Sequence, residues 1–447
     1  MGSIMQCLFL IPHPSERQIL LASSPSGYSL PSWTLPETWA GRPTQEHERA
    51  LLLNQAVHEQ FGLTTVVLLV TSRNAERLAI FETLRLPSGP LLAGHWVSAE
   101  GLVSLPSVDP SHRPLLEAWL AEEEQIVQGE RMPWQRRGWF TETASWMARQ
   151  LELQGLALPT PVEQLYTKYG ACMLRGSTTD GNVYLKALPP SFAREPQLVA
   201  YLARHFPRLV PPILAINETR NWLLMQQAPG RLLSDLTDMS AWERALCTFA
   251  ELQIACVSRK EELLAIGCPD LRLSVISAQL EPLLDDQAAL RVDQSDGLSR
   301  EQVIQLRTRV PELQATCHCL AECGVPETLE HGDFNPMNIL VQDEQITYLD
   351  WTDASLTHPF FSALRLLSYF LPTSLKEQHP HLIQRLRTAY LEPWTAYAPM
   401  DRLLEAFEHA TTPMLLHRAL NYSLLDFTRR GIPWERSMVV TRHLQAL

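Results

Sequence analysis

Three oxygen-bearing side chains lie at fixed spacings in the segment HGDFNPMNILVQDEQITYLDW, residues 331–351. Asp333 can accept the proton of a hydroxyl group. Asn338 and Asp350 offer the hard oxygen ligands that a small divalent cation prefers. A proton acceptor beside a cation site is the set of groups that transfer of a phosphoryl group to a hydroxyl requires. These residues therefore predict phosphoryl-transfer chemistry.

The sequence between these residues predicts a β-hairpin. Two apolar runs, 339–341 and 346–349, are separated by the turn residues Asp343-Glu344. Asn338 precedes the first run and Asp350 follows the second, so the hairpin would bring both side chains to one end. An ordinary hairpin with polar ends is the alternative, but it does not require an aspartate five residues before the asparagine.

The motifs HGDFNPMNIL and YLDW resemble the H-G-D-x-x-x-x-N and D-W elements of the aminoglycoside phosphotransferase and choline kinase family, whose members are related to protein kinases. The resemblance covers about residues 159–447. It implies a bilobal protein-kinase-like fold that binds ATP and Mg²⁺ and moves the γ-phosphate to a hydroxyl of a small molecule. It also implies that Asp333 is the catalytic base and that Asn338 and Asp350 hold Mg²⁺.

A lysine in the predicted nucleotide lobe completes this set. Asp180-Gly181 predicts a tight hairpin turn, and Lys186 lies in the middle of the strand that follows. A lysine among apolar neighbours needs an anionic partner. The resemblance makes that partner the ATP phosphates, with Glu195 orienting the ammonium group. The alternatives are an outward-facing strand lysine and, for Glu195, a plain acid at a helix start.

A further strand near residues 222–225 leads into the predicted hinge between the lobes. By resemblance, backbone groups of Gln226, Gln227 and Ala228 contact adenine there. The loop that covers the phosphates lacks the G-x-G-x-x-G of protein kinases and retains only Gly170.

The first third of the chain shows the order strands, helix, strands, helix over about residues 4–123. Thr44 is the expected cap of the first helix and Gly62 its end, and its expected apolar face consists of Ala50, Leu53, Val57 and Phe61. This layout resembles a Nudix hydrolase domain, whose box reads G-x5-E-x7-R-E-U-x-E-E-x-G-U, where U is apolar. With the two glycines on Gly41 and Gly62, the chain keeps few of the fixed residues, namely Val57, Glu59 and Leu63.

The missing box residues are the ones that would bind metal. His47 stands at the position of the first glutamate, and Ala56 and Gln60 replace two of the later ones. An alanine offers no oxygen ligand and a glutamine only a neutral one. Hydrolysis is therefore expected to be lost or very weak, which leaves a structural or ligand-sensing role, although Glu46 or Glu48 can lie near the missing acid.

The sequence thus predicts a multidomain protein of mixed α/β and α+β class. Trp134, Trp139 and Trp146 stand close together between the two resemblances, and such large side chains predict a packed brace because they seldom stay exposed to water. The expected domains are a degenerate Nudix-like α/β/α sandwich (1–125), a Trp-rich linker or brace (126–158), a nucleotide-binding kinase N-lobe (159–228) and a kinase C-lobe with catalytic loop and acceptor site (229–447).

Several residues of the helical lobe carry expectations of their own. Capping boxes predict helix starts at Ser240 and Ser299. His331 is expected to be a structural hydrogen-bonding residue. Family members often place an aspartate at the position of Ser362 to brace the catalytic loop, so the brace is expected to be weaker here, with Asp353 compensating. A cationic acceptor would need an acidic pocket, for which the lobe offers Asp401, Glu405, Glu408, Asp426 and Glu435.

Composition limits the remaining functions. The 447 residues carry a formal net charge of −12 with a pI of about 5.6, which argues against nucleic-acid or anionic membrane partners. No leader or apolar span is recognisable, and the 8 cysteines are too sparse for a disulfide framework, so a cytoplasmic location is expected. The alternatives are a nucleotide-binding pseudokinase acting as a sensor and a Nudix pyrophosphohydrolase. The acceptor and the oligomeric state stay open.

Overall fold

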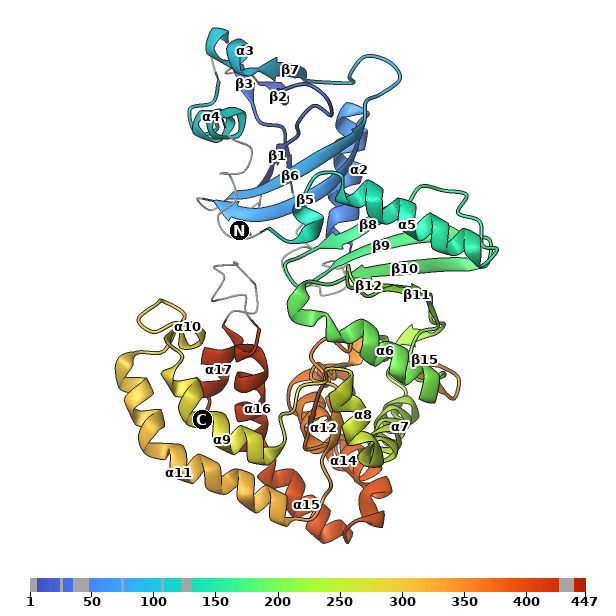
Figure 1. Ribbon diagram of the computed structural model, residues 1–447, viewed down its shortest axis with the longest axis vertical. Coiled ribbons are helices and arrows are strands. Elements are labelled where there is room, and N and C mark those ends of the chain that lie inside the picture. Colours follow the sequence, from blue (N-terminus) through green and yellow to red (C-terminus); the bar gives the residue numbers. More distant parts are fainter. Residues whose placement is uncertain are drawn as a thin grey trace. The chain divides into compact units, whose positions relative to one another are not determined.

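The computed structural model describes residues 6–24, 27–34, 48–73, 76–105, 108–121, 131–425 and 438–447. Contacts within the chain divide it into two compact units. Unit 1 comprises Met1–Pro189 and Trp222–Leu224, and unit 2 comprises Pro190–Asn221 and Met225–Leu447. The elements of both units are labelled in Figure 1.

The N-terminal part of unit 1 contains two β-sheets. One has the strand order β4-β1-β6-β5, in which β1 and β6 are parallel, and the other has the order β3-β2-β7. Successive residues of β1, β2, β5 and β6 are buried, which is typical of strands that are covered on both faces. The elements are β1 (Gln6–Leu10), β2 (Gln18–Ser24), β3 (Gly27–Ser29), β4 (Ser32–Thr34), α2 (Arg49–Phe61), β5 (Thr64–Arg73), β6 (Glu76–Arg85), β7 (His95–Ser98), α3 (Ala99–Ser104) and α4 (Arg113–Ala121).

Helix α2 packs against the first sheet (Figure 1). Its buried residues recur at the spacing of one helical face, as the sequence predicted. Gly62 ends the helix with a φ of 74°, a left-handed conformation that favours glycine. The described helix begins at Arg49, and the expected cap Thr44 lies outside the described residues, as do Gly41, Glu46 and His47. The buried face consists of Ala50, Leu53, Ala56, Val57 and Phe61.

The tryptophan-rich linker is packed, as expected for such large side chains, while its role as a brace between domains stays a prediction. Trp134 and Trp139 are buried. The rings of Trp139 and Trp146 meet the ring of Trp222 edge-on, at centroid distances of 6.1 and 5.4 Å, and the Trp134 Nε1 donates to the main-chain oxygen of Lys168 at 2.8 Å. The linker forms η2 (Pro133–Gln135) and α5 (Trp139–Leu153).

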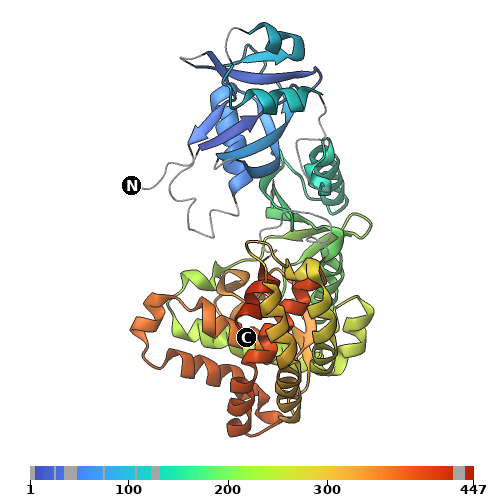
Figure 2. The same ribbon diagram turned by 90° about the vertical axis from the view of Figure 1, so that its left-hand side faces the viewer.

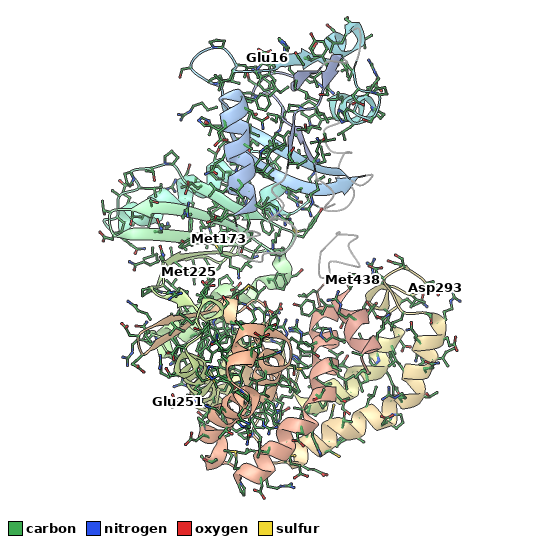
Figure 3. All side chains as sticks on the ribbon, turned by 180° about the vertical axis from the view of Figure 1, so that it is seen from behind. Glu16, Met173, Met225, Glu251, Asp293 and Met438 are labelled. Atoms are coloured by element: carbon green, nitrogen blue, oxygen red, sulfur yellow. The ribbon has the colours of Figure 1, made fainter. Side chains whose placement is uncertain are left out.

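Three antiparallel strands follow the linker in unit 1: β8 (Glu163–Thr167), β9 (Cys172–Thr178) and β10 (Gly181–Ala187). Met173 on β9, labelled in Figure 3, is the register partner of Lys186 on β10. Gly181 has a φ of 117° at the tight turn between β9 and β10, as the Asp-Gly pair predicted.

Gln164 on β8 connects this sheet to β5. Its Nε2 donates to the main-chain oxygen of Val67, and its Oε1 accepts the main-chain N–H of Val67, both at 2.8 Å. The same Oε1 accepts from the Nδ2 of Asn54 on α2 at 3.3 Å. A buried side-chain amide thus makes the pair of hydrogen bonds that a neighbouring strand would otherwise make.

Unit 2 consists mainly of helices packed side by side, shown from another direction in Figure 2. In Figure 3, Glu251 marks helix α7 and Asp293 the turn before α11. The helices are η3 (Pro190–Phe192), α6 (Arg194–His205), η4 (Leu233–Asp235), α7 (Met239–Cys256), η5 (Val257–Arg259), α8 (Lys260–Ala265), α9 (Leu273–Asp285), α10 (Gln287–Leu290), α11 (Arg300–Glu322), η6 (Pro336–Asn338), α12 (Phe360–Arg365), η7 (Leu366–Phe370), α13 (Thr373–Gln378), α14 (Leu382–Leu391), η8 (Glu392–Ala396), α15 (Met400–His409), α16 (Thr411–Ser423) and α17 (Val439–Gln445).

Short strands carry the loops of unit 2. The hairpin predicted after Asn338 is confirmed, since β15 and β16 pair antiparallel with Ile339 opposite Tyr348. The strands are β11 (Ile213–Asn217), β13 (Arg231–Leu232), β14 (Thr328–Glu330), β15 (Ile339–Gln342), β16 (Gln345–Tyr348) and β17 (Ser355–Thr357). Strand β12 (Trp222–Gln226) is divided between the units, since its first three residues belong to unit 1. Within the described residues, no helix is long and apolar enough to cross a membrane.

One of the two predicted capping boxes is correct. Ser299 accepts the main-chain N–H of Gln302, whose side chain accepts the main-chain N–H of Ser299, at the start of α11. The other prediction was wrong, because Asp238 caps α7 by accepting the main-chain N–H of Ser240. Asp238 lies two residues before Ser240 and offers a charged acceptor, so the aspartate rather than the serine caps the free main-chain N–H groups at the helix start.

Candidate active site

The catalytic loop begins where β14 ends. Gly332 has a φ of 77°, and a Cβ atom at this position would lie 2.1 Å from the main-chain oxygen of Asp353. Only glycine fits this close approach between two loops. Asp333 lies between this turn and η6, and its side chain is 11% exposed.

Asp333 lies in a network of directed hydrogen bonds. Its Oδ1 accepts from the Nη1 of Arg365 at 2.6 Å, and the same nitrogen donates to the main-chain oxygen of Gly332 at 3.0 Å. Its Oδ2 accepts from the Nδ2 of Asn338 at 3.3 Å. Both carboxylate oxygens are therefore oriented, which holds the side chain in one position for accepting a proton.

Asn338 and Asp350 lie at the same end of the hairpin, as predicted. The main-chain N–H of Leu349 donates to the main-chain oxygen of Asn338 at 2.8 Å, so Asp350 follows directly on the residue opposite Asn338. The Nδ2 of Asn338 also donates to the main-chain oxygen of Asp333 at 3.0 Å. This bond fixes the amide so that its Oδ1 is the atom left for a cation.

Asp350 has an unusual backbone. Its φ of 59° is left-handed, and a residue other than glycine adopts this conformation at a cost of about 1–3 kcal/mol. Its Oδ1 accepts a short hydrogen bond from the hydroxyl of Thr352. Such strain persists where the surroundings impose it, often at functional sites.

Helix α6 holds the loop that follows Asp350. Glu195 is 1% exposed; one carboxylate oxygen accepts from the main-chain N–H of Trp351 at 3.1 Å, and the other lies 2.9 Å from the hydroxyl oxygen of Thr352. The Nη2 of Arg194 donates to the main-chain oxygen of Thr352 at 3.0 Å. Glu195 is thus a buried anchor of this loop rather than a plain acid at a helix start. The predicted pairing of Glu195 with Lys186 stays a prediction.

His331 is a structural residue, as expected. Its Nδ1 accepts the main-chain N–H of Asp333 at 3.3 Å, and its Nε2 lies 2.9 Å from the main-chain oxygen of Leu349. The first contact requires an unprotonated Nδ1, so Nε2 carries the proton and donates it. Burial lowers the pKa of His331. A neutral ring with both nitrogens engaged connects the catalytic loop to the hairpin.

Ser362 braces the loop through a buried carboxyl group. Its hydroxyl accepts the main-chain N–H of His331 at 3.3 Å and donates to the Oε1 of Glu330 at 2.7 Å. Burial raises the pKa of Glu330 to about 7, although the hydrogen bond from Ser362 and the charges of Arg418 and Arg365 act in the other direction. The acid expected at position 362 is therefore replaced by a serine and a glutamate from two different elements.

Asp353 is held by helix α16. Its carboxylate accepts a short hydrogen bond from the hydroxyl of Tyr422 and lies 3.8 Å from the Nη1 of Arg418, while its main-chain oxygen accepts from the Nδ2 of Asn421 at 2.7 Å. Arg418 also donates to the main-chain oxygen of Gly332. Asp353 therefore belongs to a buried network behind the loop, which agrees with the compensating role expected for it.

The other predicted residues lie in separate parts of the chain. Lys186 on β10 of unit 1 is 5% exposed, so the interpretation as an outward-facing strand lysine is wrong. Gln226 is the last residue of β12, and Gln227 and Ala228 follow it in unit 2. The main-chain N–H of Gln226 donates to the main-chain oxygen of Pro212 at 2.9 Å, and Ala228 is buried. Their contact with adenine stays a prediction.

The sequence analysis missed Arg365 and Arg418. Arg365 stands one helical turn after Ser362, so a helix starting near Ser362 would have placed both side chains on one face. No comparable signal marked Arg418, because it lies 85 residues after Asp333 in a helix whose residues 413–423 are all buried.

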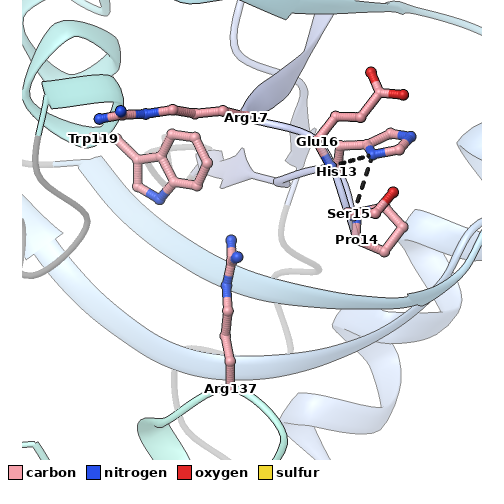
Figure 4. A pocket seen from close by; sticks show the side chains of 7 residues that line it. All are labelled: His13, Pro14, Ser15, Glu16, Arg17, Trp119 and Arg137. Carbon is pink, nitrogen blue, oxygen red and sulfur yellow. Dashed lines mark hydrogen bonds between the residues drawn. The ribbon is translucent and has the colours of Figure 1, made fainter.

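Unit 1 contains a pocket of about 270 Å³ at the turn between β1 and β2 (Figure 4). Trp119 and Arg137 line one side, with the guanidinium carbon 5.8 Å from the indole ring centre. On the other side, the Nδ1 of His13 accepts the main-chain N–H groups of Ser15 and Glu16 at 3.3 and 3.0 Å. The turn is therefore shaped by its own histidine, and the pocket offers an aromatic face and cationic groups.

Comparison with known proteins assigns the family. The model of the phosphotransferase enzyme family matches residues 177–403, which is just over half of the chain and includes all the catalytic-loop residues described above. The chain therefore belongs to the phosphotransferase enzyme family, and its C-terminal region has the protein-kinase-like fold. Among curated proteins, the sequence search found no match.

Solved structures of similar fold include a macrolide 2′-phosphotransferase from Brachybacterium faecium, with 17% sequence identity, a TM-score of 0.40, and coverage of 63% of this chain and 98% of that chain. An ethanolamine kinase from Plasmodium vivax has 11% identity, a TM-score of 0.49, and coverage of 72% and 95%. A choline kinase from Cryptosporidium parvum has 11% identity, a TM-score of 0.45, and coverage of 64% and 88%.

Proposed function

We propose that the protein transfers the γ-phosphate of ATP, with Mg²⁺, to a hydroxyl group of a small molecule. The proposal depends on one observation. Asp333 lies on the catalytic loop, Asn338 and Asp350 lie at the adjoining end of the hairpin, and the Nδ2 of Asn338 donates hydrogen bonds to Asp333. The family assignment supports the reaction class. ATP and Mg²⁺ are the donor and cation that such a set of groups serves.

In this proposal Asp333 accepts the proton of the acceptor hydroxyl. One carboxylate and one amide oxygen, from Asp350 and Asn338, suit Mg²⁺, which usually keeps water and phosphate oxygens as its other ligands. When bound, Mg²⁺ neutralises charge on the phosphates. We further propose that Lys186 contacts the phosphates and Glu195 orients it, and that main-chain groups of Gln226–Ala228 bind adenine.

We propose that the N-terminal region is a degenerate Nudix-like sandwich without hydrolytic activity. In support, Ala56 is 4% exposed and faces the core from α2, where the resembling family would place a glutamate. Glu59 is exposed on the same helix. One remaining acid is too few to bind the metals that such hydrolysis needs.

The test of the proposed function is Asp333→Asn. We expect it to lower the rate of phosphate transfer by about 10²–10⁴-fold because the amide cannot accept the proton, while the affinity for ATP–Mg²⁺ changes little. The control is Glu281→Gln, on the exposed surface of α9. The assay follows γ-phosphate transfer over a panel of hydroxyl compounds, with nucleotide binding measured by calorimetry.

Three results would contradict the proposal. Full turnover by Asp333→Asn would show that Asp333 is not the catalytic base. Stabilisation by ATP–Mg²⁺ without transfer to any acceptor would indicate a nucleotide-binding sensor, and pyrophosphate cleavage that is lost in Glu59→Ala would indicate a Nudix hydrolase.

A further inference from the structure

The catalytic base has a guanidinium group directly beside it. Arg365 uses a single nitrogen, Nη1, for both of its hydrogen bonds, to Asp333 and to the main-chain oxygen of Gly332. Its side chain is 16% exposed. Among the residues that the structure describes, Nε and Nη2 of Arg365 make no hydrogen bond, and neither atom is an unpartnered buried group. One edge of this cation is therefore open beside the base.

The open edge has a defined chemistry. Nε and Nη2 of a guanidinium present two parallel N–H groups, which match the two oxygens of a carboxylate or a phosphate. The position of the group is restrained by its two hydrogen bonds and by the ring of Phe370, whose centre lies 5.0 Å from the central carbon. A restrained guanidinium loses little conformational entropy when it binds an anion. The geometry thus favours a negatively charged group next to Asp333.

The backbone after Arg365 is specialised. Residues Leu366–Phe370 form the π-helix η7, a rare conformation that appears frequently at functional sites. Tyr369 in this turn is 62% exposed, so the turn presents an aromatic ring to the outside. The π-helix follows directly on the residue that binds the catalytic base, so an irregular, partly exposed element adjoins Arg365.

Of the acids expected to bind a cationic acceptor, Asp401 lies on the exposed surface of α15, and two others are paired with arginines. Glu405 pairs with Arg402 at 2.5 Å, and Glu408 pairs with Arg387 at 3.6 Å. Asp426 and Glu435 lie outside the described residues. In the described part of unit 2, the cation paired with Asp333 is Arg365, and its open edge is complementary to an anionic group.

We propose that the phosphate acceptor is a hydroxy acid or a phosphorylated alcohol whose anionic group binds the Nε–Nη2 edge of Arg365. The proposal rests on the function proposed above and names its substrate class. In the reaction, the acceptor oxygen forms a bond to the γ-phosphorus while the bond from that phosphorus to the ADP oxygen breaks. ADP leaves with the electron pair, and the hydroxyl proton passes to Asp333. Arg365 keeps the hydroxyl beside the base by holding the neighbouring anion.

The test compares three acceptors of one skeleton: glycerate as the anion, glyceramide as the neutral form and 3-amino-1,2-propanediol as the cation. Phosphate transfer from ATP–Mg²⁺ and binding in the presence of ADP–Mg²⁺ are both measured. Because a charge-assisted, two-point hydrogen bond contributes about 1.5–3 kcal/mol, we expect glycerate to have a kcat/KM about 10–100-fold above glyceramide, and the amine to be the poorest of the three.

The variant Arg365→Gln separates binding from positioning. We expect it to raise the KM for glycerate by about 10–100-fold and to remove the preference over glyceramide, with the KM for ATP unchanged. Arg365→Lys should restore part of the preference because it keeps the charge but not the paired N–H groups. The control is Arg385→Gln, whose guanidinium pairs with Glu243 on the surface.

The outcomes are distinguishable. An equal loss of kcat for all three acceptors in Arg365→Gln, with the preference for glycerate retained, would show that Arg365 only positions Asp333 and would overturn the proposal. Preferred binding or turnover of the amine would overturn the acceptor class and leave the phosphotransferase function intact. Equal binding of glycerate and glyceramide, or no binding of either, would also overturn it. If the wild type does not bind ATP–Mg²⁺, this result would instead contradict the proposed function.

Discussion

A buried carboxyl group beside the catalytic loop connects protonation to stability at the scale of single residues. Glu330 is 2% exposed and its pKa is raised from 4.5 to about 7 by burial. A raised pKa means that the folded protein binds the proton more tightly than the unfolded chain does. The protonated form therefore contributes stability that is fully present below pH 4.5 and is lost as the pH rises through about 7.

This sign gives a measurable prediction. Between pH 4.5 and 7 the free energy of unfolding of the wild type should fall, by on the order of 3 kcal/mol, relative to that of Glu330→Gln. The amide keeps the oxygen that accepts from Ser362 but cannot ionise. The measurement is urea unfolding at a series of pH values, with Glu322→Gln on the exposed surface of α11 as control. Parallel pH profiles for wild type and Glu330→Gln would contradict the prediction.

At the scale of elements, the catalytic loop and the loop at Asp353 approach each other through Gly332. We predict that Gly332→Ala is strongly destabilising, because the added Cβ would lie 2.1 Å from the main-chain oxygen of Asp353 and the left-handed backbone adds about 1–2 kcal/mol. The readout is the free energy of unfolding together with phosphate transfer.

Gly324 offers a matched control for this prediction. It has nearly the same backbone, with a φ of 79°, but an added Cβ would meet nothing within 4 Å. Gly324→Ala should therefore show only the backbone cost and retain activity. If the two variants lose equal stability, the contact with Asp353 is not what requires glycine at position 332.

At the scale of the whole molecule, Gln164 joins the strands of unit 1 that come from distant parts of the sequence. Gln164→Leu leaves both the N–H and the C=O of Val67 without their partner. Since an unsatisfied buried polar group costs about 1–3 kcal/mol, we expect the free energy of unfolding to fall by at least that amount. Gln55→Leu, on the exposed side of α2, is the control in thermal and urea unfolding. Equal stability of the two variants would contradict a connecting role for Gln164.

Much of the local structure was predictable from sequence patterns. The hairpin of β15 and β16 followed from two apolar runs and a turn, the face of α2 from its helical spacing, and the turn at Gly181 from its dipeptide. Each of these features depends on a few neighbouring residues, so side-chain pattern and backbone preference are enough to predict it. The start of α7 was misassigned because two neighbouring residues competed for one cap, and only the folded backbone selected Asp238.

The sequence by itself determined which residues can do the chemistry, since Asp333, Asn338 and Asp350 are recognisable from type and spacing. Only the tertiary structure decided what surrounds them: Arg365 on the base, the pair Ser362 and Glu330 in place of one acid, and α16 behind Asp353. These partners come from segments tens of residues away. Hydrogen-bond geometry and burial depend on how such segments pack, and no local pattern in the chain encodes that packing.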